Sequence, residues 1–334
     1  MLNKIGLIGG GWIGGVLAQE VVNRKLARTV GFTDPAPFVN PKDPEDRQAV
    51  QKKQSVARGK VLDIGAGLPL LGRDVKFEAS KEYGVLEGSD LIISTAGVPR
   101  KARPDGSFPT REELLTINLK VTKQVAGAIK KYCPNATILN IANPLDAIVY
   151  TLNKELKPAK NKLFGMAGVL DSTRYRYFVS EAAGVSVENV EALVLGGHGD
   201  TMVPVRSTCR IAGMPVEKFV DEETLKAIET RTRKAGGEVV GLLGFGSAFS
   251  SPAWSALEMA EAIIYDKKKI LPTCALLEGE YGVKGIYVGV AAVLGKDGME
   301  KVIEVDLNDE EKKAFANSVE HVKKTCAEVD KMLG

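Results

Sequence analysis

The chain has 334 residues, of which 44% are hydrophobic and 26% are charged, and its net charge is +3. These values are typical of a globular protein with one large or two medium domains, and the scattered basic residues argue against nucleic-acid binding. No apolar run approaches the roughly 20 residues of a membrane span, and the chain enters a predicted strand too early for a signal peptide. We therefore expect a soluble, cytoplasmic protein with neither a nucleic acid nor a membrane as its partner.

The first half alternates short β-branched runs with longer helical patterns, which predicts a parallel, doubly wound α/β sheet. The predicted strands are Ile5–Ile8, Thr29–Phe32, Val75–Ala79, Leu91–Thr95 and Thr137–Ile141. The predicted helices are Trp12–Arg24, Ala57–Ala66 and Thr110–Lys131. The polar, proline-rich stretch between Asp34 and Gly59 predicts a long loop with a short helix from Pro44 to Gln54.

The second half predicts a mixed α/β domain packed on the first, and we divide the chain into residues 1–148 and 149–334. Its predicted elements are the strands Ala192–Gly196 and Gly285–Leu294 and the helices Asp221–Leu243 and Pro252–Tyr265. A last helix is expected after Asn308, which with Glu311 forms a capping box. One apolar stripe follows it: Phe315, Val319, Val322, Cys326, Val329 and Leu333.

The four cysteines lie far apart, with no spacing typical of a metal site or a disulfide framework. We expect reduced structural thiols and no bound metal. They are Cys133, Cys209, Cys274 and Cys326.

A GxGxxG motif with glycines at Gly9, Gly11 and Gly14 directly follows the first predicted strand. The glycines permit a tight turn, a close approach to a pyrophosphate, and close packing of helix on strand, while Trp12 and Ile13 open a helix that favours anions. Asp34 ends the next strand, where its carboxylate would bind an adenosine ribose and repel the 2′-phosphate of NADP. The motif favours NAD, although a ligand-free glycine turn and an ordinary turn aspartate remain alternatives.

The chain has two histidines. His321 falls on the polar face of the last helix and is expected to be a surface residue. His198 lies between two glycines after an apolar strand, which suits an imidazole that must meet a substrate, with a structural histidine as the alternative. Upstream, Asp171 and Arg174 are three residues apart and share one helix face, although a helix cap and a surface arginine would look the same.

These motifs together resemble the lactate/malate dehydrogenase family, in that family's order and from about residue 3 to residue 332. The resemblance rests on His198-Gly-Asp, Leu170-Asp-Ser-Thr-Arg, Asn143-Pro144, the glycine motif and the loop after the fourth strand. The malate dehydrogenases of the lactate-dehydrogenase-like branch look closest. The family implies a Rossmann NAD-binding domain, a C-terminal catalytic domain, and a homotetramer or dimer.

The resemblance also implies a role for each matching residue. His198 would exchange the hydroxyl proton, with Asp171 fixing its tautomer. Arg174 would hold the substrate carboxylate in a bidentate fork, and Arg111 would polarise the carbonyl when a loop closes. Asn143 would bind the substrate or the nicotinamide end. The remaining coenzyme contacts implied are Ala96, Gly97 and Asn118.

The loop after the fourth strand decides between substrates. Arg100 matches the malate-enzyme pattern, in which an arginine pairs with the second carboxylate. The stretch 102–109 is longer than is usual in malate enzymes and resembles apicomplexan lactate dehydrogenases, so Arg103 could bind the carboxylate or Phe108 could fill the pocket. A solvated surface insertion is the alternative. We expect a malate dehydrogenase, with lactate or a broader set of 2-oxo acids as the rival substrates and a non-catalytic NAD-binding protein as the rival class.

Overall fold

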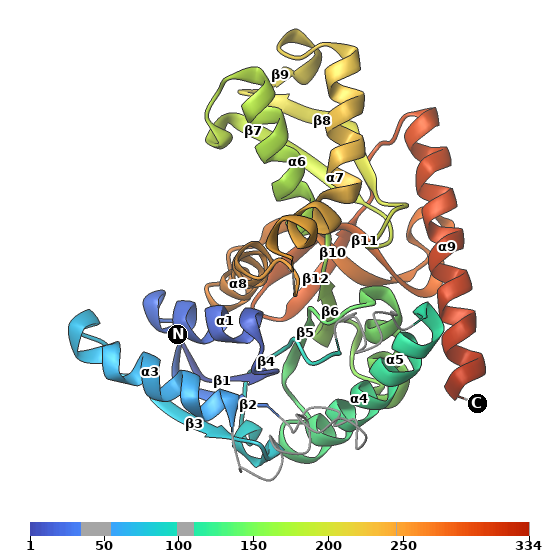
Figure 1. Ribbon diagram of the computed structural model, residues 1–334. Helices are drawn as coiled ribbons and strands as arrows, with labels where there is room; N and C mark the ends of the chain where they lie inside the picture. Colours follow the sequence, from blue (N-terminus) through green and yellow to red (C-terminus); the bar gives the residue numbers. More distant parts are fainter. Residues whose placement is uncertain (35–54, 99–109, 245, 334) are drawn as a thin grey trace.

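The computed structural model describes residues 1–34, 55–98, 110–244 and 246–333 (Figure 1). The long loop and the short helix predicted from Pro44 to Gln54 lie outside the described residues, as does the loop 99–109. The strands are β1 (Leu2–Ile8), β2 (Ala27–Thr33), β3 (Lys76–Ser80), β4 (Leu91–Ser94), β5 (Thr137–Asn140), β6 (Leu163–Met166), β7 (Val190–Leu195), β8 (Val203–Ile211), β9 (Met214–Pro215), β10 (Lys269–Glu278), β11 (Lys284–Gly295) and β12 (Gly298–Ile303). The α-helices are α1 (Trp12–Asn23), α3 (Val56–Leu71), α4 (Arg111–Tyr132), α5 (Leu145–Leu156), α6 (Gly168–Ala183), α7 (Glu222–Leu243), α8 (Ser250–Ile264) and α9 (Asp309–Leu333).

Every strand and helix predicted within the described residues is present. The largest difference in length is in α3, which continues to Leu71 rather than ending at Ala66. The strands β6, β8, β9, β10 and β12 and the helix α5 were not predicted. Short strands such as β6 carry little local signal, because only their neighbours in the sheet define them.

The described residues form one nine-stranded sheet in the order β12-β11-β10-β6-β5-β4-β1-β2-β3. The six strands from β3 to β6 pair in parallel, which is the strand order of the Rossmann fold. The order reverses between β1 and β4, and such a switch point is where open α/β sheets bind ligands, beyond the carboxyl ends of the strands. The predicted doubly wound α/β fold is confirmed.

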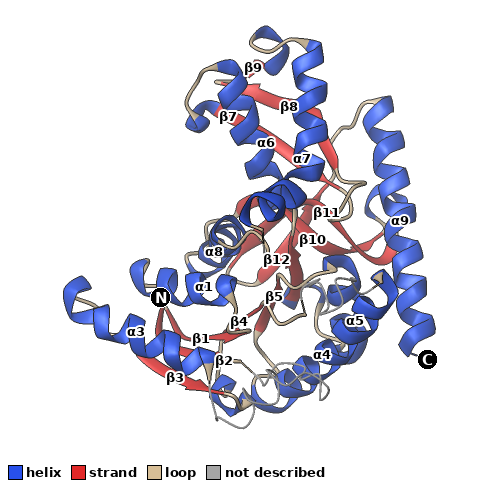
Figure 2. Ribbon diagram, viewed as in Figure 1, coloured by secondary structure: helices blue, strands red, loops and turns tan. Residues whose placement is uncertain are grey.

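Strands from the second half extend this sheet. Thr273 of β10 pairs with Met166 of β6 in antiparallel register, and β11 and β12 follow, also antiparallel. The remaining strands, β7, β8 and β9, form a small antiparallel sheet with α6 and α7 beside it (Figure 2). The second half is therefore a mixed α/β structure, as expected.

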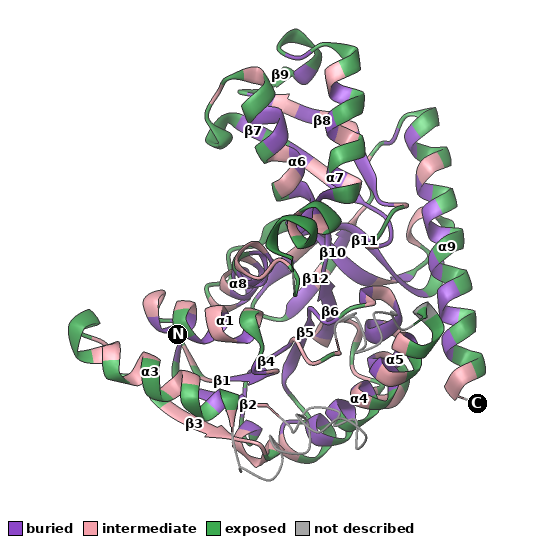
Figure 3. Ribbon diagram, in the orientation of Figure 1, coloured by how far each residue is buried: buried purple, intermediate pink, exposed green. Residues whose placement is uncertain are grey.

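Helices cover both faces of the large sheet, with α1, α3 and α8 on one side and α4, α5 and α9 on the other (Figure 1). Side chains of β1 alternate between the two layers. Leu7 belongs to the same buried cluster as Leu17 of α1, whereas Ile8 belongs to that of Ile129 of α4. Figure 3 shows the buried residues gathered on the central strands, such as β10 and β11. This double coverage explains why the central parallel strands β4, β5 and β6 are buried at every residue.

The last helix begins as its sequence predicts. The Asn308 N–H donates to the Glu311 carboxylate at 3.0 Å, and the Glu311 N–H donates to Asn308 Oδ1 at 2.9 Å. The predicted stripe is buried from Phe315 to Val329, whereas its last residue, Leu333, is half-buried, and His321 is exposed. Among the helices in the described ranges, none is long and apolar enough to cross a membrane. The four cysteines are buried free thiols.

Candidate active site

The turn after β1 has the open backbone that a dinucleotide phosphate requires. Gly9 has a φ of +111°, a conformation that L side chains rarely adopt. A Cβ on Gly14 would lie 1.9 Å from the carbonyl oxygen of Gly9, so only glycine lets α1 approach the turn so closely. A Cβ on Gly11 would meet no heavy atom of the described residues within 4 Å. The space at the start of α1, where Trp12 and Ile13 follow, therefore fits a pyrophosphate.

Asp34 follows β2 and lies against this turn, where its Oδ1 accepts a hydrogen bond from the Gly10 N–H at 3.1 Å. Lys60 reaches the same turn from α3, where its Nζ donates to the carbonyl oxygen of Gly11 and lies 5.8 Å from the centre of the Trp12 ring. Burial lowers the pKa of Lys60, and the Asp34 carboxylate opposes that shift. The sequence analysis missed Lys60, since no pattern links it to a turn in another element.

Asn118 of α4 joins the loops that follow β4 and β5. Its Oδ1 accepts from the Val98 N–H at 2.7 Å, and its Nδ2 donates to the carbonyl oxygens of Val98 and Asn143, both at 3.2 Å. Gly97 lies between them, and a Cβ there would be 3.4 Å from Asn118 Oδ1. The structure thus brings together four predicted coenzyme residues: Ala96, Gly97, Asn118 and Asn143.

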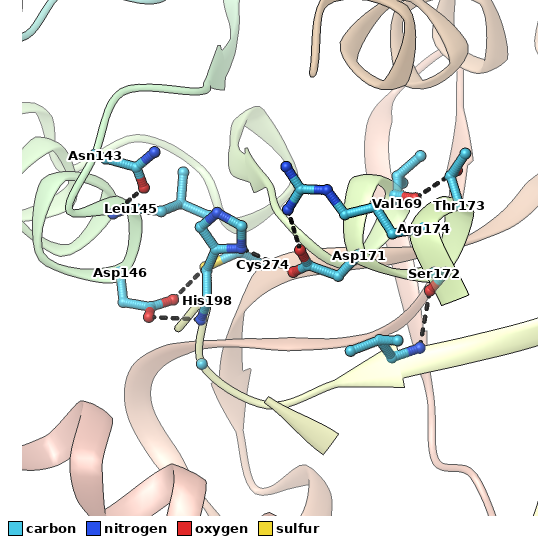
Figure 4. Close-up of polar contacts among 12 residues, drawn as sticks. Asn143, Leu145, Asp146, Val169, Asp171, Ser172, Thr173, Arg174, His198 and Cys274 are labelled. Carbon is cyan, nitrogen blue, oxygen red and sulfur yellow. Dashed lines mark hydrogen bonds and ion pairs between the residues drawn. The ribbon is translucent and has the colours of Figure 1, made fainter. Parts of the chain in front are cut away.

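His198 and Asp171 form a close pair, although the two residues come from different elements (Figure 4). The Nδ1 atom of His198 lies 2.8 Å from Asp171 Oδ2, and because a carboxylate can only accept, Nδ1 carries the hydrogen. The side chain of Asp171 is 2% exposed and that of His198 is 16% exposed. Burial opposes a charge on the ring, but Asp171, and then Asp146, outweigh it and raise the pKa of His198 above its ordinary value.

Arg174 extends from the same helix face as Asp171. Its Nη1 lies 3.4 Å from Asp171 Oδ1, and Figure 4 shows its guanidinium and the His198 ring on either side of this carboxylate. Burial lowers the pKa of Arg174, although Asp171 counteracts this. An acid–base group and a planar cation therefore lie close together, which suits a substrate with a reacting oxygen and a carboxylate.

Of the two other predicted arginines, Arg111 and Arg100, the structure describes only the backbone of Arg111. Arg111 is the first residue of α4, after Thr110, whose side chain accepts from the Glu113 N–H at 3.1 Å in a capping box. The side chain of Arg111 lies outside the described residues. Arg100 lies outside them entirely, as do Arg103 and Phe108.

Asp146 is a second acidic residue of this site that the sequence analysis missed. It belongs to the first turn of α5, and its Oδ2 accepts from the main-chain N–H of His198 at 3.0 Å. The thiol of Cys274 donates to its other oxygen, with Sγ and Oδ1 3.5 Å apart. The only sequence signal was its place three residues after Asn143 in the Asn-Pro motif.

The fold and the site together define a class of enzyme. A glycine turn and Asp34 lie at the switch point of a Rossmann sheet, and a buried histidine–aspartate pair with an arginine has the chemistry needed for proton transfer and anion binding. These features are typical of an NAD-dependent dehydrogenase.

Comparison with known proteins identifies the family. The lactate/malate dehydrogenase NAD binding domain matches residues 3–165, and the alpha/beta C-terminal domain of the same family matches residues 168–333. The chain belongs to the lactate/malate dehydrogenase family, and its coenzyme is NAD.

Similar proteins include both malate and lactate dehydrogenases. Malate dehydrogenase 1 of Anaeromyxobacter dehalogenans is 46% identical over 97% of each chain. The malate dehydrogenase of Cryptosporidium parvum is 38% identical, with a TM-score of 0.88 over 99% of this chain and 100% of that one. The lactate dehydrogenase of the same organism, solved with lactic acid and nicotinamide adenine dinucleotide, is 37% identical, with a TM-score of 0.88 over 99% and 98%.

Proposed function

We propose that this enzyme is a malate dehydrogenase, which interconverts malate and oxaloacetate with NAD. The observation that carries the chemistry is the 2.8 Å contact between His198 Nδ1 and Asp171, with Arg174 beside it. The 46% identity to a malate dehydrogenase and the presence of Arg100 support the choice of substrate. Within this proposal, residues 1–148 bind NAD and residues 149–334 bind the substrate.

The proton moves through His198. Asp171 takes up the Nδ1 hydrogen bond and so leaves Nε2 as the atom that gives a proton to the carbonyl oxygen during reduction and removes it during oxidation. The bound coenzyme supplies or accepts the hydride at the substrate carbon. Because Asp171 is almost fully buried, water does not compete for its carboxylate, and the imidazolium is stabilised.

Arg174 binds the carboxylate next to the reacting carbon, and Arg111 polarises the carbonyl oxygen. A guanidinium holds a carboxylate with two parallel hydrogen bonds, which fixes both its position and its orientation. The side-chain oxygen of Asn143 accepts from the Leu145 N–H at 3.2 Å, and this hydrogen bond holds the side-chain amide in one orientation. Asn143 completes the site beside the nicotinamide.

Arg100 selects the dicarboxylate in this proposal. Oxaloacetate brings two carboxylates, and Arg174 neutralises only one of them. An unpaired charge in a closed pocket costs about 3–5 kcal/mol, which corresponds to about two to four orders of magnitude in kcat/KM. With pyruvate, Arg100 itself would be the unpaired charge, so the same residue would favour one substrate and reject the other.

A lactate dehydrogenase is the second candidate. The stretch 102–109 is longer than is usual in malate enzymes, and solved lactate dehydrogenases of Cryptosporidium parvum and Eimeria maxima are 37% and 34% identical to this chain. If the longer loop moves Arg100 away from the pocket, Phe108 could fill it and pyruvate would be preferred.

The test is NADH oxidation by the Arg100→Gln variant with oxaloacetate and with pyruvate. We expect a strong loss with oxaloacetate and an unchanged or higher rate with pyruvate. The matched control is Arg103→Gln, which removes an arginine from the same loop and should alter neither rate. If Arg100→Gln still reduces oxaloacetate and Arg103→Gln does not, Arg103 rather than Arg100 binds the second carboxylate.

The proposed assembly is a homotetramer or a dimer. Trp12 of α1 and Trp254 of α8 are 61% and 51% exposed, and these two helices contact each other. Large apolar side chains on adjacent helices are typical of a surface that packs against a second subunit.

A further inference from the structure

Three consecutive main-chain N–H groups hold the loop that carries His198, and each donates to a different element. Gly196 donates to the carbonyl oxygen of Gly289 on β11 at 2.8 Å, and Gly197 donates to Ser318 Oγ on α9 at 2.9 Å. His198 donates to Asp146 Oδ2 on α5 at 3.0 Å. Two of these acceptors are neutral, whereas the third, directly at the catalytic histidine, is a carboxylate.

The carboxylate of Asp146 is held tightly in place. A Cβ on Gly197 would lie 3.2 Å from its Oδ2, so the loop passes very close to it. Burial raises the pKa of Asp146 above its ordinary value, and the interactions with His198 and the Cys274 thiol oppose this shift only in part. Burial also raises the pKa of the Cys274 thiol well above its ordinary value, so this group remains a hydrogen-bond donor.

A small cavity of about 60 Å³ adjoins Asp146, between the His198 loop, α5 and α9. Its polar lining includes Thr201 and Thr325 together with His321. A cavity of this size has room for a water molecule, although its lining is more apolar than polar. Both oxygens of Asp146 accept hydrogen bonds, from the His198 N–H and from the Cys274 thiol, as the oxygens of a carboxylate can.

We propose that Asp146 is a positioning residue of the reaction, which anchors the main chain of His198 and whose negative charge, together with that of Asp171, favours the protonated imidazole. This inference rests on the proposed role of His198 as the proton donor. It adds to the family's histidine–aspartate pair a second anion that contacts the histidine through its main chain.

The charges that face His198 support this assignment. Asp171 and Arg174 approach it from α6, and Asp146 approaches it from α5. His321 of α9 lines the cavity beside it, and Cys274 of β10 donates to Asp146. Arg174 disfavours the imidazolium, whereas Asp171 and Asp146 each favour it. Among the charged side chains that the structure describes here, Asp171 and Arg174 would remain next to the ring without Asp146.

The presence of only two histidines allows a direct test. In a His321→Gln background, the remaining imidazole signal in an NMR titration belongs to His198 alone. Asp146→Asn keeps an oxygen that can accept the His198 N–H but removes the charge. We expect the pKa of His198 to fall by about one unit, within the range that a nearby opposite charge produces. The descending limb of kcat/KM for reduction should move to lower pH by the same amount.

Ser318→Ala is the matched control, because it removes the neutral acceptor from the adjacent residue of the same loop. We expect it to leave the pKa of His198 unchanged, even if it lowers the melting temperature. If Asp146→Asn does not fold, Asp146→Ser provides a second neutral variant with the same expected shift.

An unchanged pKa of His198 in a folded neutral variant would overturn the inference, as would an equal shift in Ser318→Ala. The titration uses no substrate, so it remains readable if oxaloacetate proves to be the wrong substrate. Conversely, failure of the titration would leave the oxaloacetate assay unaffected.

Discussion

In the proposed mechanism the ring of His198 presents the same nitrogen to the substrate in every turnover, and two contacts hold it for this role. Asp171 fixes the tautomer through Nδ1, and Asp146 fixes the main chain. The first contact follows from residue types that can be identified in the sequence, because a glycine-flanked histidine and a buried aspartate form a familiar pair. The second could not be predicted, since Asp146 binds a main-chain N–H, which every residue but proline has.

His198→Ala should nearly abolish turnover and leave NADH binding intact. The imidazole acts on the substrate, whereas the glycine turn and Asp34 lie at the coenzyme site. A general acid–base group contributes about 10²–10⁴-fold to the rate. The measurements are steady-state kinetics and NADH fluorescence titration. A loss of coenzyme affinity as large as the loss of rate would mean that His198 is structural.

The two directions of the reaction should respond oppositely to pH. Reduction needs the imidazolium, so its kcat/KM is full below the pKa of His198 and declines as the pH rises through it. Oxidation needs the neutral ring and should rise through the same pKa. Because the aspartates raise this pKa, the shared midpoint should lie above the ordinary value of 6.5. A midpoint below that value, or the same trend in both directions, would contradict this assignment.

At the scale of elements, local sequence patterns predicted the features that depend on interactions between residues close in the sequence. The capping box at Asn308 predicted where α9 begins, and the apolar stripe after it predicted which face of α9 is buried. Such patterns could not predict contacts between segments that lie far apart in the sequence. The register of Thr273 with Met166 joins segments more than a hundred residues apart, and Lys60 reaches the glycine turn from another helix.

Two glycines of the turn should respond differently to alanine. Gly11→Ala adds a Cβ in open space at a backbone angle that alanine tolerates, so the melting temperature should be unchanged while NADH binding weakens. Gly14→Ala places its Cβ 1.9 Å from the Gly9 carbonyl oxygen, so it should reduce both the melting temperature and the affinity for NADH. Calorimetry and NADH titration of the two variants decide this. Normal NADH affinity in Gly11→Ala would show that the phosphates bind elsewhere.

At the scale of the whole molecule, the site is assembled from both halves of the chain. The glycine turn and Asn118 come from the first half, and Asp171, Arg174 and His198 come from the second. Asp146 links them, because it belongs to the helix after β5 and holds the loop after β7. The family and its NAD site could be predicted from motif order, whereas the choice of substrate depends on a loop whose length departs from the usual pattern.

The assembly should be visible in solution. We expect sedimentation velocity at micromolar concentration to show a homotetramer or a dimer. Trp254→Glu places a charge on the exposed surface of α8 and should produce a smaller species, because an unpaired charge opposes burial in an interface. Glu258→Gln, on the same helix, is the control and should leave the assembly unchanged. A monomeric unmodified chain would end this proposal.

The central claim is that the enzyme reduces a dicarboxylate at the His198–Asp171 pair. The most direct measurement is kcat/KM of the unmodified chain for oxaloacetate and for pyruvate, with NADH at one pH. We expect oxaloacetate to be preferred by about two to four orders of magnitude, the value of a paired second carboxylate. An equal rate with both substrates, or a preference for pyruvate, would contradict the account.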